Sequence, residues 1–459
     1  MSNKYSVSPY RPAVSKAPAL VYYVKSNPPK RIIDAKEVDI REYNGEDKEQ
    51  SKQRPQGKPE KQPWSALFSS NASNSKQPAH SHPKLLELRG LINLGNLCFA
   101  NAIFQSLVFC QPFYEFFVQL GRELPFSFNK TPLLDATIMF LNEFRVVDDD
   151  DMPLHTGEPF TPTVIYDAMK VYNRFSQIQL GQQEDAEEFL GFFLDTLHEE
   201  LLSISPRLKP RTGTALHDWF EGLPNGNTAD QPTQPDDGWL EVGHKNKTLS
   251  TKSTNSAESP LTKMFGGKFR SVLKTPGQKD SVTLEPFQPL QLDIQPDNIH
   301  SIEDALINLA QPEIIHGVHS SSKQGPVDAT KQVTIDTCPP ILIIHLKRFL
   351  YDSIGGVLKS NKKIGYQSQL KIPNEIISPS KRPAEGLNYR LFAVVYHHGQ
   401  SSGSGHYTID VLRQNHKQWV HIDDIAMDLL AEKDVVITNS SQINNHDDKV
   451  AYLLLYSKM

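Results

Sequence analysis

The sequence predicts an α+β fold in which helical segments come first and strands follow. Helical patterns occur at residues 99–110, 133–144 and 184–202, whereas residues 268–456 carry short runs rich in β-branched and aromatic residues. Separate blocks of helix and strand favour an antiparallel sheet, because alternating strand and helix units would produce a parallel one. No repeat of fixed period is present, which argues against a solenoid.

Residues 1–84 are predicted to be a mostly disordered tail. They are rich in Pro, Ser, Lys, Asn and Gln, and such a composition cannot bury enough apolar surface to fold alone. Two short apolar islands, residues 19–24 and 64–68, either dock onto a partner or back onto the domain, or are transient segments without a partner. Folded structure is expected from residue 85 to residue 459.

The helical part, about residues 85–203, contains a regular amphipathic pattern at residues 184–202. Its apolar residues recur on one stripe, so we expect that face to be buried in the core. Asp185 and Glu188, three positions apart, are then left near a solvent-facing edge. Residues 204–258 are rich in Pro, Gly, Asn, Thr and Ser, which predicts a flexible insertion.

Strands are expected in the remaining part, about residues 259–459. Their signal is apolar alternation within short runs that are bounded by turn-forming residues. The expected strands are residues 268–274, 280–284, 290–294, 330–336, 341–349, 389–397, 406–412, 419–422 and 450–456.

Length, charge and cysteine content restrict the class of protein. The 459 residues are enough to bury a large core. With 48 Lys and Arg against 53 Asp and Glu, the formal charge of -5 gives no electrostatic reason to expect nucleic acid as a partner. Three widely spaced cysteines do not make a disulfide framework, so a reducing compartment is expected, either cytosol or nucleus. The sequence contains no apolar run of about 18 residues, the length that a membrane-spanning helix requires, so membrane insertion is not expected.

The segment 90–98, GLINLGNLC, places a cysteine directly before a helical pattern. A thiol at a helix N-terminus faces unpaired N–H groups and the positive end of the helix dipole, which favour thiolate over thiol. Because the thiolate is the form that attacks carbonyl groups, Cys98 is the candidate nucleophile. Cys110 and Cys338 lack this setting and are expected to be structural residues.

A histidine and two carboxylates far downstream are candidates to activate that thiol. His406 lies between small residues in the segment 403–407, GSGHY, and is the candidate base. Asp423 is the candidate to fix the imidazole tautomer by accepting from one ring nitrogen. Asp424 is its close competitor for this role.

Asn93 is the candidate donor to the negative charge that develops on the attacked carbonyl oxygen. A side-chain amide aimed at this oxygen lowers a reaction barrier by about 3 kcal/mol. The backbone N–H of Cys98 is a natural second donor, since it belongs to the unpaired amides of the helix terminus. Asn96 is a weaker alternative, because turns and helix caps also favour asparagine.

Four ordered motifs resemble those of the ubiquitin-specific proteases. The matching segments are residues 90–107 for the Cys box, 183–189 for the glutamine/aspartate helix motif, 342–349 for the strand that follows, and 396–407 with 419–424 for the His box. The resemblance covers about residues 88–458. It implies a papain-like hand with a helical thumb that carries Cys98, an antiparallel β palm that carries His406 and Asp423, and β fingers.

The resemblance implies a deubiquitinating thiol protease. Such an enzyme hydrolyses isopeptide, peptide or thioester bonds after the C-terminal Gly of ubiquitin, and its partners are ubiquitin and ubiquitinated proteins. The arginines of the ubiquitin tail would pair with Asp185 and Glu188. Gly405 and Tyr407, which flank the histidine, would also contact the tail. Residues 398–405, HGQSSGSG, look like the family's blocking loop, because they combine little bulk with high backbone freedom.

The sequence departs from the family at its zinc site. Many members hold the fingers together with zinc bound by two C-x-x-C pairs, and this chain has none, so we expect no metal or other cofactor and fingers held by packing alone. His300, His316 and His319 match no familiar ligand spacing. The missing pairs and residues 259–294 resemble one branch, whose members work in the cytoplasm with a cofactor related to the Ras-GAP SH3-domain-binding proteins.

Two other functions remain as alternatives. A catalytically weak ubiquitin-binding scaffold would share the fold, but here every candidate catalytic residue is present. A protease for a ubiquitin-like modifier would share the chemistry, although the acidic pair Asp185 and Glu188 favours a tail that carries arginine.

Overall fold

The computed structural model describes residues 84–124, 126, 130–148, 156–176, 183–205, 208, 215–221, 250–253, 257–320, 322–351, 357–401, 405–438 and 449–459. All of them belong to one compact unit, Gln62–Met459. The predicted tail lies outside the described residues except for Lys84, and so does most of the predicted insertion, residues 204–258.

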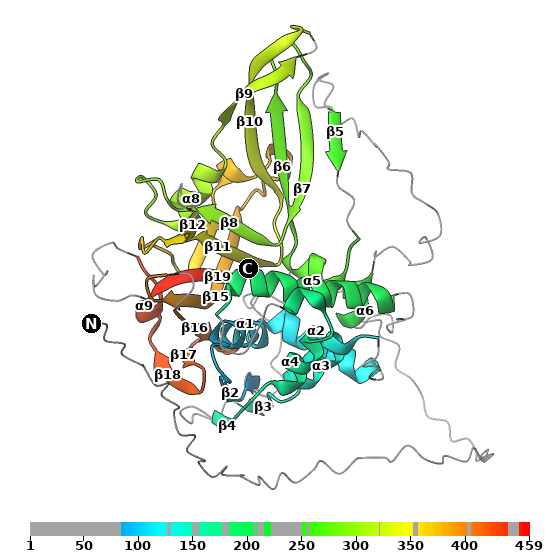
Figure 1. Ribbon diagram of the computed structural model, residues 1–459, viewed down its shortest axis with the longest axis vertical. Helices are drawn as coiled ribbons and strands as arrows, with labels where there is room; N and C mark the ends of the chain where they lie inside the picture. Colours follow the sequence, from blue (N-terminus) through cyan, green and yellow to red (C-terminus); the bar gives the residue numbers. More distant parts are fainter. Residues whose placement is uncertain are drawn as a thin grey trace, which may run out of the picture. The chain divides into compact units, whose positions relative to one another are not determined.

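A helical layer is formed mainly by the first half of the described chain, drawn from blue to green in Figure 1. Its helices are α1 (Cys98–Val108), α2 (Gln111–Glu123), α3 (Pro132–Leu141), α4 (Thr163–Met169), α5 (Ala186–Ile204), α6 (Ala215–Phe220) and α7 (Pro260–Phe265). Short strands accompany them, namely β1 (Lys84–Leu86), β2 (Leu88–Leu91), β3 (Val146–Asp148) and β4 (Thr156–Phe160). None of the helices in the described part of the chain has the length and hydropathy that a membrane crossing requires.

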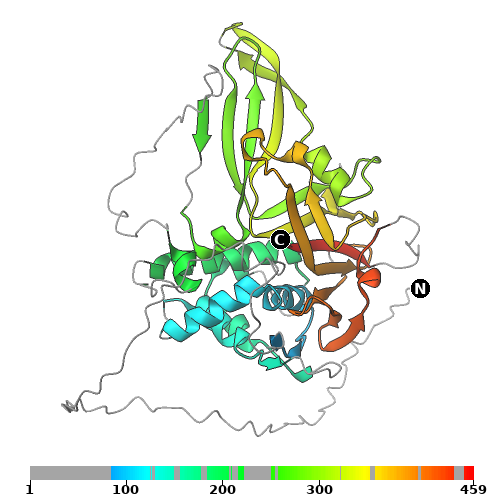
Figure 2. The same cartoon turned by 180° about the vertical axis from the view of Figure 1, so that it is seen from behind.

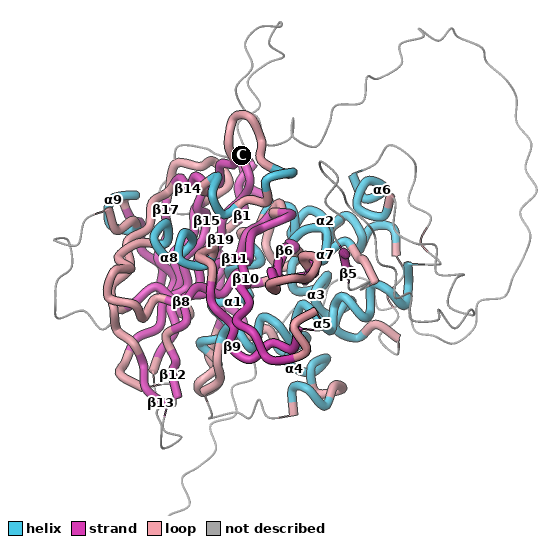
Figure 3. The backbone as a smooth tube through the Cα atoms, turned by 90° about the horizontal axis from the view of Figure 1, so that it is seen from above, coloured by secondary structure: helices cyan, strands magenta, loops and turns pink. Residues whose placement is uncertain are grey.

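Helix α1 lies between the other helices of this layer and the large sheet described below (Figure 3). All of its side chains, from Cys98 to Val108, are buried. Phe99 and Phe104 pack edge-on against Phe189 of α5, with ring centroids 5.4 and 5.6 Å apart. Such aromatic pairs stabilise by about 0.5–1.5 kcal/mol beyond the area that they bury, so the helix that carries Cys98 is held firmly on this side.

The palm is a sheet with the strand order β18-β17-β16-β15-β19-β11-β8, to which β14 adds by pairing with β15. Its strands are β8 (Pro289–Asp293), β11 (Ile341–Lys347), β14 (Gln369–Ile372), β15 (Leu387–His398), β16 (His406–Leu412), β17 (Trp419–Asp423), β18 (Ala426–Leu430) and β19 (Val450–Lys458). The predicted α+β class is confirmed. The sheet is not wholly antiparallel, because β8 pairs parallel with β11. A long connection through the fingers separates these two strands, and parallel pairing requires such a connection.

The fingers form a second sheet with the order β5-β7-β6-β10-β9, at the top in Figures 1 and 2. Its strands are β5 (Ser250–Ser253), β6 (Gly267–Lys274), β7 (Ser281–Phe287), β9 (Glu313–Ser320) and β10 (Gly325–Thr337). Phe269 and Phe287 stack across β6 and β7 with ring centroids 4.3 Å apart. Helix α8 (Ile302–Leu309) follows β8, and the smaller elements β12 (Phe349–Tyr351), β13 (Val357–Lys359) and α9 (Glu432–Val435) complete the described fold.

A buried carboxylate joins two helices of the helical layer. Glu200 of α5 accepts hydrogen bonds from the backbone N–H groups of Leu133 and Leu134 at 3.0 and 2.5 Å, and also from the Tyr172 hydroxyl. These two N–H groups lie in the first turn of α3, where no partner exists within the helix. Glu200 therefore caps α3 from a neighbouring helix.

We predict that Glu200→Ala lowers the free energy of unfolding by about 2–3 kcal/mol, because it leaves buried N–H donors without their acceptor. The neighbouring change Glu199→Ala is the matched control. Glu199 makes an exposed ion pair with Arg174 at 2.7 Å, and exposed pairs contribute about 0–1 kcal/mol. Urea denaturation of both variants measures the difference. Equal losses would show that the cap of α3 does not depend on Glu200.

Candidate active site

Cys98 is the first residue of α1 and follows a tight turn. Gly95 and Asn96 have φ angles of 106° and 56°, which place both residues in the left-handed region that reverses the chain within few residues. The Asn93 side-chain oxygen stabilises the turn, since it accepts from the backbone N–H groups of Gly95 and Leu97 at 3.1 and 2.9 Å. The turn therefore delivers the thiol to the helix N-terminus and holds Asn93 beside it.

His406 begins β16 and Asp423 ends the neighbouring strand β17, so the palm brings them together. His406 Nε2 lies 2.6 Å from Asp423 Oδ1. Interaction with the Cys98 side chain and then with Asp423 raises the pKa of His406 to about 9, against the opposing effect of burial. The imidazole therefore binds the carboxylate and is close enough to the thiol to interact with it.

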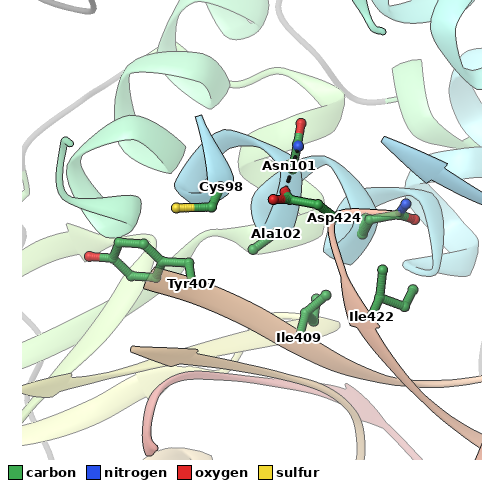
Figure 4. Close-up of a pocket in the computed structure, with 8 residues that line it drawn as sticks. Cys98, Asn101, Ala102, Tyr407, Ile409, Ile422 and Asp424 are labelled. Carbon is green, nitrogen blue, oxygen red and sulfur yellow. Dashed lines mark hydrogen bonds between the residues drawn. The ribbon is translucent and has the colours of Figure 1, made fainter. Parts of the chain in front are cut away.

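Asp424 makes a different set of contacts from Asp423. It lies in the turn between β17 and β18 with a φ of 51°. Its carboxylate accepts from Asn93 Nδ2 at 2.9 Å and from Asn101 Nδ2 at 2.8 Å; Figure 4 shows the second contact. The structure thus separates the two carboxylates that compete in the sequence for His406. Asp423 contacts the imidazole, and Asp424 ties the palm to the turn before Cys98 and to α1.

The residues predicted to contact a peptide tail gather at the N-terminus of α5. Asp185 is the N-cap of this helix and accepts from the Glu187 backbone N–H at 2.7 Å. Both of its carboxylate oxygens lie 2.6 Å from the Tyr452 hydroxyl. Asp185 is therefore only partly exposed, because it caps the helix and its carboxylate binds the hydroxyl of the buried Tyr452. Glu188, one turn further on, is exposed.

Gly405 and Tyr407 flank His406 and face the same helix end. The Gly405 N–H donates to the side-chain oxygen of Gln183, and the Gln183 amide donates to the Gly405 carbonyl oxygen. A Cβ atom at position 405 would come within 2.4 Å of His397 Nε2, so only glycine fits there. Tyr407 is buried, and its hydroxyl oxygen lies 3.5 Å from the Ala186 backbone nitrogen. The predicted tail contacts are thus close together, with Glu188 in the first turn of α5.

Three residues near the site were missed by the sequence analysis in these roles. Gln183 bonds to Gly405, Tyr452 bonds to Asp185, and Tyr166 bonds to Asn101. Gln183 is the first residue of the helix motif, so its position in the sequence gave a signal. The two tyrosines had no signal, since the sequence does not show which distant residue a hydroxyl contacts.

Two groups of side chains in the described part of the chain could offer metal ligands. One is His217, Asp218 and Glu221, and the other is His406 with Asp423 and Asp424. In the second group, the histidine nitrogen and the carboxylate oxygens already form the hydrogen bonds described above. His316 belongs to neither group and pairs with Asp328 at 2.9 Å. Cys98 begins α1, Cys110 precedes α2 and Cys338 lies between β10 and β11, and three cysteines cannot form the four-thiolate zinc site expected for related fingers.

Comparison with known proteins gives a consistent family. The family model for ubiquitin carboxyl-terminal hydrolase matches residues 89–456. "Probable ubiquitin carboxyl-terminal hydrolase 3" of Schizosaccharomyces pombe is 41% identical over 83% of this chain and 76% of its own length. Ubiquitin carboxyl-terminal hydrolase 10 of Rattus norvegicus is 37% identical over 82% of this chain but only 49% of its own length. The chain thus spans about three quarters of the first relative and about half of the second.

Solved structures with the same fold include two SAGA modules. A yeast SAGA DUBm with an Sgf73 mutant has a TM-score of 0.58 and 19% identity, over 84% of this chain and 71% of the other. The SAGA Ubp8/Sgf11/Sus1/Sgf73 DUB module bound to ubiquitin aldehyde has a TM-score of 0.55 and 20% identity, over 81% and 70%. The family and fold predicted from the sequence motifs are therefore confirmed. The chain belongs to the ubiquitin carboxyl-terminal hydrolase family and is a ubiquitin-specific protease, a cysteine-type deubiquitinase.

Proposed function

We propose that the chain hydrolyses isopeptide, peptide or thioester bonds after the C-terminal Gly of ubiquitin, with Cys98 as nucleophile. The observation that carries this is the pairing of His406 with Asp423 at 2.6 Å, together with the interaction of the same imidazole with Cys98 at the N-terminus of α1. The other two thiols have no comparable setting. Burial raises the pKa of Cys110 to about 12 and that of Cys338 to about 11, so both stay protonated at neutral pH.

In the first half of the proposed reaction, the Cys98 thiolate attacks the carbonyl carbon of the terminal glycine. A carbon–sulfur bond forms, and the electron pair of the C=O double bond moves to the oxygen. The Asn93 amide nitrogen has two N–H donors, one of which binds Asp424, so the other can bind this oxyanion. When the carbonyl reforms and the carbon–nitrogen bond breaks, the His406 imidazolium gives its proton to the leaving lysine amine.

In the second half, a water molecule hydrolyses the thioester. Neutral His406 takes a proton from the water, whose oxygen attacks the same carbonyl carbon. The carbon–sulfur bond then breaks, which releases the ubiquitin carboxyl group and returns the Cys98 thiolate. Asp423 accepts from His406 Nε2 at 2.6 Å throughout, which keeps the other ring nitrogen directed at the thiol.

We propose that the ubiquitin tail reaches Cys98 past the N-terminus of α5. Gly405 and Tyr407 line this approach, and Asp185 and Glu188 supply negative charge for the arginines of the tail. Asp185 must then share its carboxylate between Tyr452 and an arginine, which a carboxylate with about four lone-pair sites can do.

The test is reaction of the full chain with ubiquitin that carries a thiol-reactive group in place of its C-terminal carboxyl. We expect one adduct, and peptide mapping should place it on Cys98. The same group on a ubiquitin-like modifier should react far more slowly. Faster reaction with that modifier would change the substrate class, and failure of both probes would support a binding scaffold instead.

We also propose a partner and a location on the basis of the motif resemblance. A cofactor related to the Ras-GAP SH3-domain-binding proteins would bind residues 1–84, of which only Lys84 is among the described residues. The protein would work in the cytoplasm or nucleus. Binding of the purified cofactor to the full chain and to a chain without residues 1–84 measures the first point. Equal binding would remove the tail from the proposal, and cell imaging tests the location.

A further inference from the structure

A chain of hydrogen bonds runs from α4 to the candidate oxyanion donor. The Tyr166 hydroxyl of α4 donates to Asn101 Oδ1 at 3.1 Å. Asn101 Nδ2 donates to Asp424 Oδ1 at 2.8 Å and to the Leu91 carbonyl oxygen at 3.2 Å. Asp424 Oδ2 accepts in turn from Asn93 Nδ2 at 2.9 Å. Four side chains from separate parts of the sequence are therefore linked in one line.

We propose that Tyr166 is a positioning residue for the hydrolysis, which acts on the oxyanion donor Asn93 through Asn101 and Asp424. This inference rests on the proposed function, since it concerns the same reaction. Tyr166 itself is separated from Asn93 by two intervening side chains, so it does not touch the reacting atoms.

The orientation of the Asn101 amide depends on the Tyr166 hydroxyl. Asn101 is only 2% exposed, so water does not readily replace its partners. Its nitrogen faces two oxygen acceptors, those of Asp424 and Leu91, and its oxygen therefore needs a donor on the opposite side. The Tyr166 hydroxyl is that donor. Without it the amide oxygen is a buried acceptor that has lost its partner, which weakens the hold of Asn101 on Asp424.

Asp424 then determines where the free N–H of Asn93 points. The Asn93 oxygen is fixed by the backbone N–H groups of Gly95 and Leu97, and one N–H of its nitrogen is fixed by Asp424. An amide is planar, so these contacts leave a single direction for the remaining N–H. The backbone oxygen of Asp424 also accepts from the Leu91 N–H at 2.9 Å, which attaches the same turn to β2. A looser Asp424 therefore loosens the oxyanion donor.

The position of the Tyr166 ring is itself well defined. The ring packs against Phe104 of α1, with centroids 6.0 Å apart. In addition, the Ile92 backbone N–H donates to the Phe160 carbonyl oxygen at 2.9 Å, which connects the segment before α4 to the segment that carries Asn93. The hydroxyl is thus held by packing rather than by the hydrogen bond alone, and Tyr166→Phe removes the oxygen with little change in shape.

The experiment measures kcat and KM of Tyr166→Phe with an isopeptide-linked ubiquitin substrate. Active sites are titrated with the covalent ubiquitin probe, so that unfolded protein does not contribute. We expect kcat to fall about 3- to 10-fold, the effect of one hydrogen bond, with KM unchanged. Tyr114→Phe is the matched control. Its hydroxyl donates to the Phe144 carbonyl oxygen at 3.0 Å in the same helical layer, and we expect its kcat to stay at the wild-type value.

A double-mutant cycle separates positioning from general stability. If Tyr166 acts through Asn93, adding Tyr166→Phe to Asn93→Ala lowers kcat no further, because the donor that it orients is gone. If the two losses multiply, or if Tyr166→Phe alone keeps the wild-type kcat, the proposal is overturned. Failure of the proposed function itself looks different, since the wild-type chain and Tyr114→Phe would then show no turnover either.

Discussion

Replacing Cys98 with alanine should abolish hydrolysis of ubiquitin conjugates while leaving ubiquitin binding intact. The substitution removes the atom that forms the covalent intermediate, and loss of a nucleophile of this kind lowers kcat by about 10⁶-fold. Binding should persist, because the proposed tail contacts lie at the N-terminus of α5 and not on the thiol. Turnover of an isopeptide-linked ubiquitin and the Kd for free ubiquitin measure the two parts.

Cys110→Ala is the matched control for this change. Cys110 is also buried in the helical layer, where it is the N-cap of α2, but it has no histidine partner that the structure shows. Its replacement should leave kcat unchanged and cost only some stability. Retained turnover in Cys98→Ala, or its loss in Cys110→Ala alone, would assign the nucleophile to the wrong thiol.

Most of the late strands could be predicted from the sequence, because their apolar alternation is strong, but β9, β14 and β18 were not expected. Strand β16 spans His406–Leu412, the range expected, and β17 ends one residue later than expected, at Asp423. This accuracy matters for the site, since both residues of the candidate His–Asp pair lie at ends of these strands. Strand ends are defined by pairing, and the alternation of β16 and β17 sets their pairing register.

Helix α2 was missed, although its sequence contains a helical signal. Phe113, Phe116, Phe117 and Leu120 recur at helical spacing and are buried. Pro112 lies two residues after the first predicted helix, residues 99–110. Proline is, however, well tolerated in the first turn of a helix, where its missing N–H has no partner to lose. Pro112 accordingly lies in the first turn of α2, which begins at Gln111.

The roles of adjacent residues could not be predicted from the sequence. Asp423 and Asp424 have the same chemistry, and their directions depend on a turn in which Asp424 takes a left-handed φ of 51°. Asp185 likewise reads as a helix-face residue until the helix start is known. Such choices depend on contacts between residues more than 200 positions apart, for example that of Asp185 with Tyr452. The order of the motifs in the sequence identifies these residues, but only the folded structure shows which partner each of them contacts.

Asp423→Ala and Asp424→Ala should both reduce turnover strongly, but with different pH profiles. We expect Asp423→Ala to lower kcat by about 10²- to 10⁴-fold, because it frees the imidazole to adopt the wrong orientation. Asp424→Ala should lower kcat by up to about 10²-fold, since it loosens the oxyanion donor Asn93 without removing it. Asn93→Ala removes the donor altogether, so its loss of kcat is the upper limit for the loss in Asp424→Ala.

The pH dependence distinguishes the two losses. Protonated His406 must give a proton to the leaving amine, so kcat/KM of the wild-type chain should fall as pH rises through about 9, the pKa to which Cys98 and Asp423 raise it. Asp423→Ala removes one of the interactions that raise this pKa, so its alkaline limb should move to lower pH. Asp424→Ala should keep the limb of the wild-type chain. If the alkaline limb moved in Asp424→Ala alone, the roles of Asp423 and Asp424 would be exchanged. The measurement requires an isopeptide substrate, because the leaving group must be a lysine amine.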